Sequence, residues 1–209
     1  PKGAGCRPYF SPLSTEKKFD TCKKLFITEG EKKSDALTHY GFPCIGLSGV
    51  YGWIDKRSGE SQPLPELEDF NWKKRQVYLV FDSDIVSKIE VLHALKSFCE
   101  FLKGKEAKTF IVLLPNELNG EKNGADDFLK RHGKNAFSDL VRIARQAFHY
   151  NSKKKEEVFT WKPEPNETHH IALTASIVFR EFYAERSGIG LFRWEEKYWQ
   201  KVKGKSKEE

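Results

Sequence analysis

The chain has 209 residues, of which 32% are charged and 38% hydrophobic, and it carries a formal net charge of +6 with a pI near 9.0. The hydrophobic fraction excludes a fully disordered chain, and the length suffices for one well-buried domain with a smaller annex. The positive balance favours a partner that bears phosphates. No apolar run reaches the roughly 18–20 residues that span a bilayer, so we expect a soluble, cytoplasmic protein.

The cysteines and the histidine pair do not have the spacing of a zinc site. The four cysteines fall at wide, irregular intervals without a Cys-x-x-Cys pair, so neither a zinc knuckle nor a disulfide framework is indicated. His169 and His170 are adjacent in a polar segment, which is not a chelating arrangement. We expect the cysteines to be reduced thiols.

The first clear pattern is a short apolar run at Lys24–Thr28, which predicts a buried strand with Glu29 at its tip. A helical pattern follows at Glu31–Tyr40, and Gly41 supplies a C-terminal stop. A second short strand is predicted at Pro43–Leu47. Strand, acid and helix therefore follow one another directly.

A long segment, Val50–Arg75, is rich in glycine, proline, serine and charge. Pro63 and Pro65 argue against regular structure there, so we predict a long surface loop. Long loops within compact domains tend to be functional.

The most strand-like stretch, Val77–Phe81, leads directly into Asp82-Ser83-Asp84 and then into a helical pattern at Glu90–Leu102. A fourth strand is predicted at Thr109–Leu114. Two short helices are then predicted, at about Asp126–Arg131 and Ala136–Tyr150.

Alternation of strands and helices predicts an α/β fold: a mostly parallel four-stranded sheet flanked by helices. We assign residues 21–150 to this domain, 1–20 to an N-terminal extension, and 151–209 to a linker and a small α+β C-terminal unit. Within that unit, Ile171–Tyr183 has helical spacing, and Gly190–Val202 predicts a strand or hairpin rich in aromatic residues.

Three carboxylates, Glu29, Asp82 and Asp84, stand at the carboxyl ends of two predicted strands, where α/β sheets place their working groups. Carboxylates brought close together need cations to neutralise them, so the pattern predicts a site for magnesium or manganese. Each signal has a simpler alternative when taken alone. Asp-x-Asp turns are common, and an acid before a helix is favoured by the helix dipole.

The ordered segments resemble the TOPRIM family, the catalytic domain of bacterial-type primases, of type IA and type II topoisomerases and of certain nucleases. The resemblance lies in Ile27–Leu37 and Val80–Asp84. More narrowly, the chain is similar to the TOPRIM-like domain of phage and plasmid primase-helicase replication proteins. Their Gly-Val-x-Gly-Trp and Gly-x-Asp-Asp-Phe/Tyr-Leu motifs correspond here to Gly49–Trp53 and Gly124–Leu129, so the resemblance covers roughly residues 21–149.

The resemblance implies that Glu29 acts as a general acid or base, or as a metal-linked carboxylate. It implies that Asp82 and Asp84 hold magnesium against phosphate oxygens. One position departs from the pattern: many family members carry an acid four residues after the glutamate, where this chain has Lys33, and the next acid is Asp35. Subfamilies that begin Glu-Gly-Glu-Lys, as Glu29–Lys32 does here, nevertheless exist.

Further candidates flank these carboxylates. Asp126 and Asp127 either complete the metal site, because their loop follows the fourth strand, or cap the helix that begins there. Lys32 and Lys33 lie in the first helical turn, where the dipole disfavours cations, so they either contact phosphate or are simply solvated.

The long loop carries a further candidate for nucleic-acid contact. Trp53, Lys56 and Arg57 combine an aromatic ring with positive charge, as expected for stacking bases and tracking phosphates. The alternative is that the tryptophan closes over the core.

Leading among the hypotheses is a magnesium-dependent DNA primase, a nucleotidyltransferase of DNA replication that makes primers on single-stranded DNA from nucleoside triphosphates. A nuclease that uses the same metals to activate water is one alternative, and a non-catalytic nucleic-acid-binding module is another. The segment from Gly190 loosely resembles the start of the helicase-linked part of such proteins, which implies a helicase or ATPase module in the parent chain. The chain begins at Pro1 and lacks methionine, so we expect a fragment.

Overall fold

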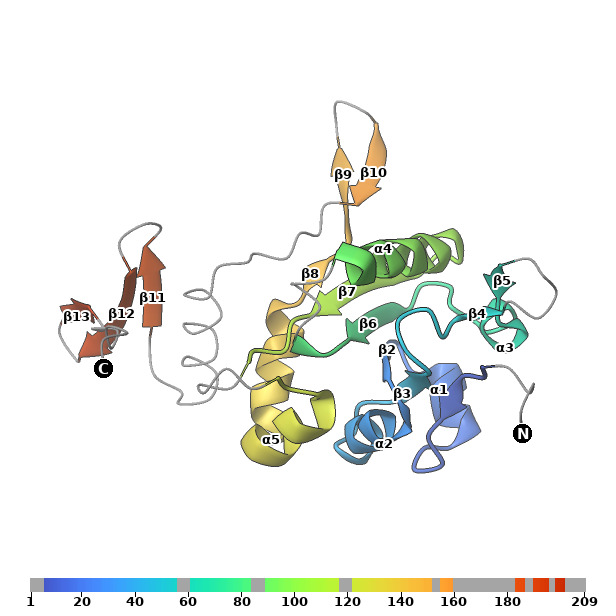
Figure 1. Cartoon of the computed structure of the whole chain (residues 1–209), viewed down its shortest axis with the longest axis horizontal. Helices are drawn as coiled ribbons and strands as arrows, with labels where there is room; N and C mark the ends of the chain where they lie inside the picture. The colour runs from blue at the N-terminus through green and yellow to red at the C-terminus, as the bar shows by residue number, and fades with distance from the viewer. Residues whose placement is uncertain are drawn as a thin grey trace.

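The computed structural model describes residues 6–55, 61–83, 89–116, 122–151 and 155–159, together with the backbone of three strands between residues 183 and 201. The predicted α/β class is confirmed: a multi-stranded sheet is flanked by helices (Figure 1). Within the described ranges, no helix is long and apolar enough to cross a membrane.

The sheet has six strands in the order β1-β3-β2-β6-β7-β8, rather than the four predicted. The four central strands are parallel to one another: β3 (Cys44–Leu47), β2 (Lys24–Glu29), β6 (Gln76–Val80) and β7 (Lys108–Val112). The two edge strands are antiparallel to their neighbours: β1 (Tyr9–Phe10) and β8 (Arg145–Gln146). Strands of two residues have no alternation to detect in a sequence, so only their tertiary pairing defines them.

Three helices cover the two faces of this sheet: α2 (Glu31–His39), α4 (Ile89–Gly104) and α5 (Ala125–Ile143). Successive strand residues point to opposite faces, so Phe26 and Tyr78 pack in one cluster with residues of α2 and α5. Leu25 and Ile27 pack in the other cluster, with residues of α4. The two clusters make three layers, with helices on both sides of the sheet (Figure 1).

The described part of the predicted N-terminal extension joins this domain. Residues 9–10 form β1 against β3, and α1 (Glu16–Thr21) buries Phe19 in the α4-side cluster. Buried Arg75 fixes α1 by donating hydrogen bonds to the carbonyls of Phe19 and Asp20. These contacts make the segment part of the core rather than a free tail.

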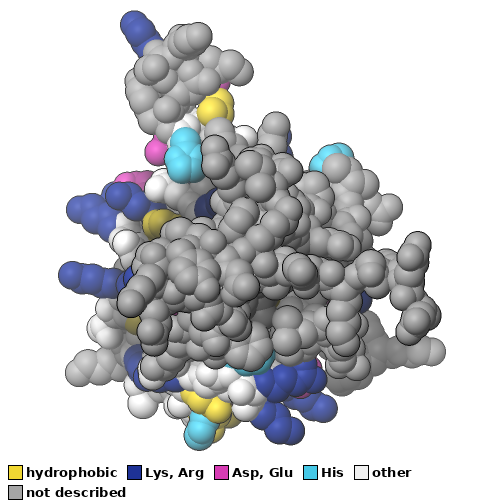
Figure 2. All heavy atoms as spheres, turned by 90° about the vertical axis from the view of Figure 1, so that its left-hand side faces the viewer, with side chains coloured by type: hydrophobic (Ala, Val, Ile, Leu, Met, Phe, Trp, Pro, Cys, Tyr) yellow, Lys and Arg dark blue, Asp and Glu magenta, His cyan; other side chains and the backbone are white. Residues whose placement is uncertain are grey.

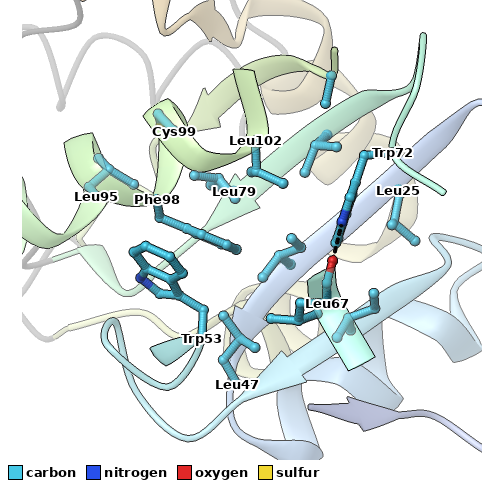
Figure 3. Close-up of a cluster of buried hydrophobic side chains, with 14 of the residues drawn as sticks. Leu25, Leu47, Trp53, Leu67, Trp72, Leu79, Leu95, Phe98, Cys99 and Leu102 are labelled. Carbon is cyan, nitrogen blue, oxygen red and sulfur yellow. Dashed lines mark hydrogen bonds between the residues drawn. The ribbon is translucent and has the colours of Figure 1, made fainter. Parts of the chain in front are cut away.

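The prediction of an irregular surface loop at 50–75 was wrong for much of that segment. It contains β4 (Ile54–Asp55), β5 (Gln62–Pro63) and α3 (Pro65–Glu68). Pro65 is compatible with α3 because it stands at the start of the helix, where its missing N–H has no partner to lose. Trp72 is buried, and its Nε1 donates a 2.6 Å hydrogen bond to the carbonyl of Leu67 (Figure 3). The loop therefore extends the α4-side core.

The two predicted helices after residue 125 form one element, α5, which is interrupted at Gly133 by a non-helical conformation (φ 76°, ψ 178°). The second part ends at Ile143, so the predicted continuation to Tyr150 was wrong. Ala147 and Phe148 are instead buried in the α4-side core. The chain forms β8 and then β9 (Phe148–Asn151), which pairs with β10 (Glu156–Phe159) across the predicted domain boundary.

The aromatic segment near the C-terminus forms an antiparallel three-stranded sheet, in agreement with the predicted hairpin. Its strands are β11 (Tyr183–Arg186), β12 (Gly190–Glu195) and β13 (Tyr198–Lys201). Tyr183, placed at the end of a predicted helix, lies in β11. The rest of that helix, 171–182, and the pair His169 and His170 lie outside the described residues.

Candidate active site

The candidate site lies at the carboxyl edge of the parallel strands. Glu29 is the last residue of β2, and Asp82 follows β6 after one further residue. The loop after β7 leads to α5, whose first turn carries Asp126. Because β2 and β6 are parallel, Glu29 and Asp82 lie at the same edge of the sheet, where the sequence predicted them, and the loop after β7 starts from that edge too.

Lys33, in the first turn of α2, forms an ion pair with Asp82. Its Nζ donates to Asp82 Oδ1, and the two side chains are 21% and 31% exposed. A pair this far withdrawn from water is less screened than a surface ion pair. The residue that departs from the TOPRIM pattern therefore neutralises one of the predicted metal ligands.

Three side chains converge at Gly124, the residue before α5. A Cβ placed on Gly124 would lie 2.7 Å from Asp126 Oδ1, 2.8 Å from Lys33 Cε and 3.5 Å from Asp82 Oδ1. A side chain at this position would push the ends of the Asp126 and Lys33 side chains aside, so glycine allows their close approach. A carboxylate from the loop after β6 and a carboxylate from the first turn of α5 therefore both lie close to the Cβ position of one glycine.

Two buried polar residues hold the loops after β6 and β7 together. The Ser83 N–H donates to the Asn123 carbonyl at 3.1 Å, and the Asn123 N–H donates to Ser83 Oγ at 3.0 Å. Asn123 Nδ2 also donates to the Pro115 carbonyl at 2.9 Å, and Arg131 donates to Asn123 Oδ1 at 3.3 Å. These bonds fix the separation between Asp82 and the start of α5. Sequence reasoning missed this clamp, because a Ser between two acids and an Asn before Gly look like ordinary turn residues.

A cleft of about 600 Å³ adjoins the convergence point. Acidic and basic side chains both line it: Arg7, Glu29, Glu31, Lys32, Lys33 and Asp126. Gly30, at φ 81°, is the N-cap of α2, and no side chain caps that end. The positive end of the helix dipole therefore adds to the charge of the lysines. The cleft offers carboxylates for a cation and cationic groups for a phosphate in one space.

Asp35, the next acid after Lys33, has a structural role. Tyr9 donates its hydroxyl to Asp35 at 3.0 Å, and Ser11 donates to the same carboxylate at 2.6 Å. These bonds tie the segment around β1 to α2. Desolvation and then the hydrogen bond to Asp35 raise the pKa of Tyr9 above its ordinary value.

The other predicted site residues do not all lie at the cleft. Asp127 is exposed in the first turn of α5 and is not among the residues that line the cleft. Asp126 is not a helix cap: the N-cap is Gly124, and Asp126 Oδ1 is buried without a hydrogen-bond partner among the described residues. Three further candidates lie outside the described residues: Asp84, Lys56 and Arg57.

Trp53 closes over the core, which was the alternative to its predicted contact with nucleic acid. Its side chain is buried, and its ring stacks on Phe98 at 5.1 Å and on Phe101 at 5.4 Å (Figure 3). The ring belongs to the α4-side core and presents no free face for a base.

The residues present fit a hard divalent cation. In the described ranges no three His, Cys, Asp or Glu side chains are grouped as metal ligands. Mg²⁺, however, keeps several waters and takes only one or two protein carboxylates. Asp82 and Asp126 supply two such groups near Gly124, and the Asp126 oxygen, which is buried and has no donor among the described residues, calls for a positive partner.

Comparison with known proteins identifies the family. The family model described as "Domain of unknown function (DUF3854)" matches residues 20–136, which is more than half of the chain. The chain belongs to the DUF3854 family. The matched segment of this DUF3854 protein includes the six-stranded sheet except its β1 and β8 edges, and it contains Glu29, Lys33, Asp82 and Asp126.

Two individual matches have limited coverage. An uncharacterized protein of Picosynechococcus sp. is 29% identical over 122 residues, which is 54% of this chain but only 12% of that protein. A crystal structure of the Aquifex aeolicus primase (zinc-binding and RNA polymerase domains) is 16% identical, covers 62% of this chain and 28% of that one, and has a TM-score of 0.43. A likeness of that size does not establish a common fold.

Proposed function

We propose that this DUF3854 domain is a TOPRIM-type nucleotidyltransferase that uses magnesium or manganese to make primers on single-stranded DNA. The observation that carries the proposal is the convergence of Asp82 and Asp126 on Gly124, next to a cleft that Glu29 and basic side chains also line. Phosphoryl transfer needs both charge types in one place, because the metal requires carboxylates and the triphosphate requires cations.

Asp82 and Asp126 would hold the cation, which when bound neutralises negative charge on the phosphoryl group being transferred. The 3′-hydroxyl oxygen attacks the α-phosphorus of the incoming triphosphate, and the bond from that phosphorus to pyrophosphate breaks. Glu29 accepts the proton of the hydroxyl as general base. Arg7 and Lys32, with the N-terminus of α2, bind the phosphates of the triphosphate.

A single-stranded nucleic-acid template suits the charge of the chain. The net charge is +6, and several lysine and arginine side chains project at the margin of the face in Figure 2. The four segments that resemble primase-helicase proteins favour primer synthesis over other phosphoryl transfers. Trp53 has no part in this interface, because its ring lies in the core.

The Lys33–Asp82 ion pair favours a second candidate function, a nucleic-acid-binding domain without metal chemistry. In that case Lys33 would permanently replace the cation. Such a domain would bind single-stranded DNA through its basic side chains alone, with an affinity that falls as salt rises.

Labelled-nucleotide incorporation on single-stranded DNA tests the proposal. The purified 209-residue chain is titrated with Mg²⁺ or Mn²⁺ and compared with the Glu29→Gln and Asp82→Asn variants. Removal of a general base lowers rates about 10²–10⁴-fold, so we expect that loss in Glu29→Gln. Asp69→Asn changes an exposed acid outside the cleft and serves as the control, with wild-type activity expected.

The products and the metal dependence separate the three functions. Metal-dependent primers that disappear in both cleft variants support the primase. Metal-dependent cleavage, lost in the same variants, would identify a nuclease. DNA binding that needs no metal and is unchanged by both substitutions would leave a binding module.

A further inference from the structure

We propose that Lys33 is a tethered cation that competes with the divalent metal for Asp82, so that metal binding requires the lysine to leave. The inference rests on the proposed function, because it concerns the metal of that same site. It assigns a role to Lys33, which stands where many TOPRIM proteins carry an acid.

Lys33 occupies the coordination space of only one of the two carboxylates. Its Nζ donates to Asp82 Oδ1, and its Cε lies 2.8 Å from the Cβ position at Gly124. Asp126 Oδ1 lies 2.7 Å from the same position, yet it is buried without a hydrogen-bond partner among the described residues. Among those residues, the lysine satisfies Asp82 and leaves this oxygen of Asp126 without a donor. A purely structural ion pair would have no reason to keep a buried acceptor empty beside it.

Electrostatics makes the lysine and the metal exclusive at Asp82. An ammonium group and a divalent cation that share one carboxylate oxygen would repel each other strongly at this partly buried position. Metal entry therefore needs Nζ to move. Lysine is suited to this, because its charge sits on a flexible four-carbon stem.

The cleft provides a place for the displaced group. Lys33 lines the cleft together with Arg7 and Lys32, and its side chain is only 21% exposed where it pairs with Asp82. A triphosphate in that cleft would give the ammonium group a new anionic partner. Without metal, the lysine keeps two neighbouring carboxylates from facing each other uncompensated.

Mn²⁺ binding to the full chain tests the competition, with Mn²⁺ alone as the probe and the free ion followed by electron paramagnetic resonance. Lys33→Gln removes the competing charge, so we expect its Mn²⁺ dissociation constant to fall about tenfold, equivalent to about 1.4 kcal/mol. Lys33→Arg keeps the charge and should bind Mn²⁺ as the wild type does. Lys32→Gln makes the same charge change one residue away, at an exposed side chain without an ion pair among the described residues, and should shift the constant less than about twofold.

A thermal unfolding scan supplies a readout that does not depend on activity. Lys33→Gln should melt below the wild type without metal, because its carboxylates lose their cation, and saturating Mn²⁺ should raise its midpoint more than that of the wild type. Unchanged or weaker Mn²⁺ binding by Lys33→Gln would overturn the inference. If Asp82-dependent Mn²⁺ binding persists in the wild type, the proposed function survives that outcome. If neither protein binds Mn²⁺ through Asp82, both proposals fail.

Discussion

Two loops leave the carboxyl edge of the sheet, one after β3 and one after β6, and different contacts anchor their described residues. The loop after β3 buries Trp53, Leu64 and Trp72 among the apolar residues of the α4-side core. The loop after β6 buries polar Ser83, which is bonded to Asn123 from the loop after β7. Buried apolar groups add to stability without fixing chemistry, whereas a satisfied polar network fixes the position of the groups beside it. Length and aromatic content therefore do not point to the loop that carries the proposed site.

The largest expected effect on stability comes from a substitution in the loop after β3. Trp53→Ala removes a ring stacked on Phe98 and Phe101 and should lower the free energy of unfolding by about 3–5 kcal/mol, measured by urea denaturation. Trp53→Phe should cost less, because it keeps a stacked ring. An alanine variant with wild-type stability but weaker DNA binding would return Trp53 to the interface and break the contrast between the loops.

Asn123→Ala tests the polar contact between the loops after β6 and β7 in the same way. The change removes the donor to the Pro115 carbonyl and the acceptor of Arg131, and it leaves buried polar groups without partners. We expect a loss of about 1–3 kcal/mol in the free energy of unfolding. Asn116→Ala, at an exposed position, is the matched control and should be nearly neutral. Equal effects of the two substitutions would show that the clamp contributes nothing.

Gly124→Ala separates two effects: a change in the position of the Asp82 and Asp126 carboxylates, and a change in the stability of the fold. The added Cβ would meet the mobile ends of Asp126 and Lys33, so unfolding should change by only about 1 kcal/mol. The same displacement should weaken Mn²⁺ binding by about tenfold, because the carboxylates lose their arrangement. Gly104→Ala, whose Cβ would meet no described atom within 4 Å apart from its chain neighbours and its own helix backbone, should leave Mn²⁺ binding unchanged and stabilise the last turn of α4 by roughly 0.5–1 kcal/mol. Wild-type Mn²⁺ affinity in Gly124→Ala would mean that the metal does not bind at this convergence.

Local patterns foretold the elements that carry the acids. The apolar runs before Glu29 and Asp82 predicted β2 and β6, since a buried parallel strand needs a continuous apolar sequence. The helix after Glu29 followed from its spacing and from Gly41. These elements were predictable because their stability and their boundaries arise within a few neighbouring residues.

The edge strands and the long-range side-chain contacts depend on tertiary pairing, so local sequence patterns could not predict them. β1 and β8 have two residues each and exist through their neighbours in the sheet. Lys33 pairs with a residue 49 positions away, and Ser83 with one 40 positions away. The loop after β3 was predicted to lie at the surface because its apolar anchors are irregularly spaced among prolines and charges.

Anomalous diffraction from crystals of the chain grown with Mn²⁺ tests the central claim most directly, because it locates the metal without reference to activity. We predict a peak beside Gly124, within coordination distance of Asp82 and Asp126, with Lys33 Nζ turned away from Asp82 Oδ1. A structure at saturating Mn²⁺ with no peak at that position, and with Lys33 still bonded to Asp82, would contradict the account and leave a lysine-neutralised domain without a metal site.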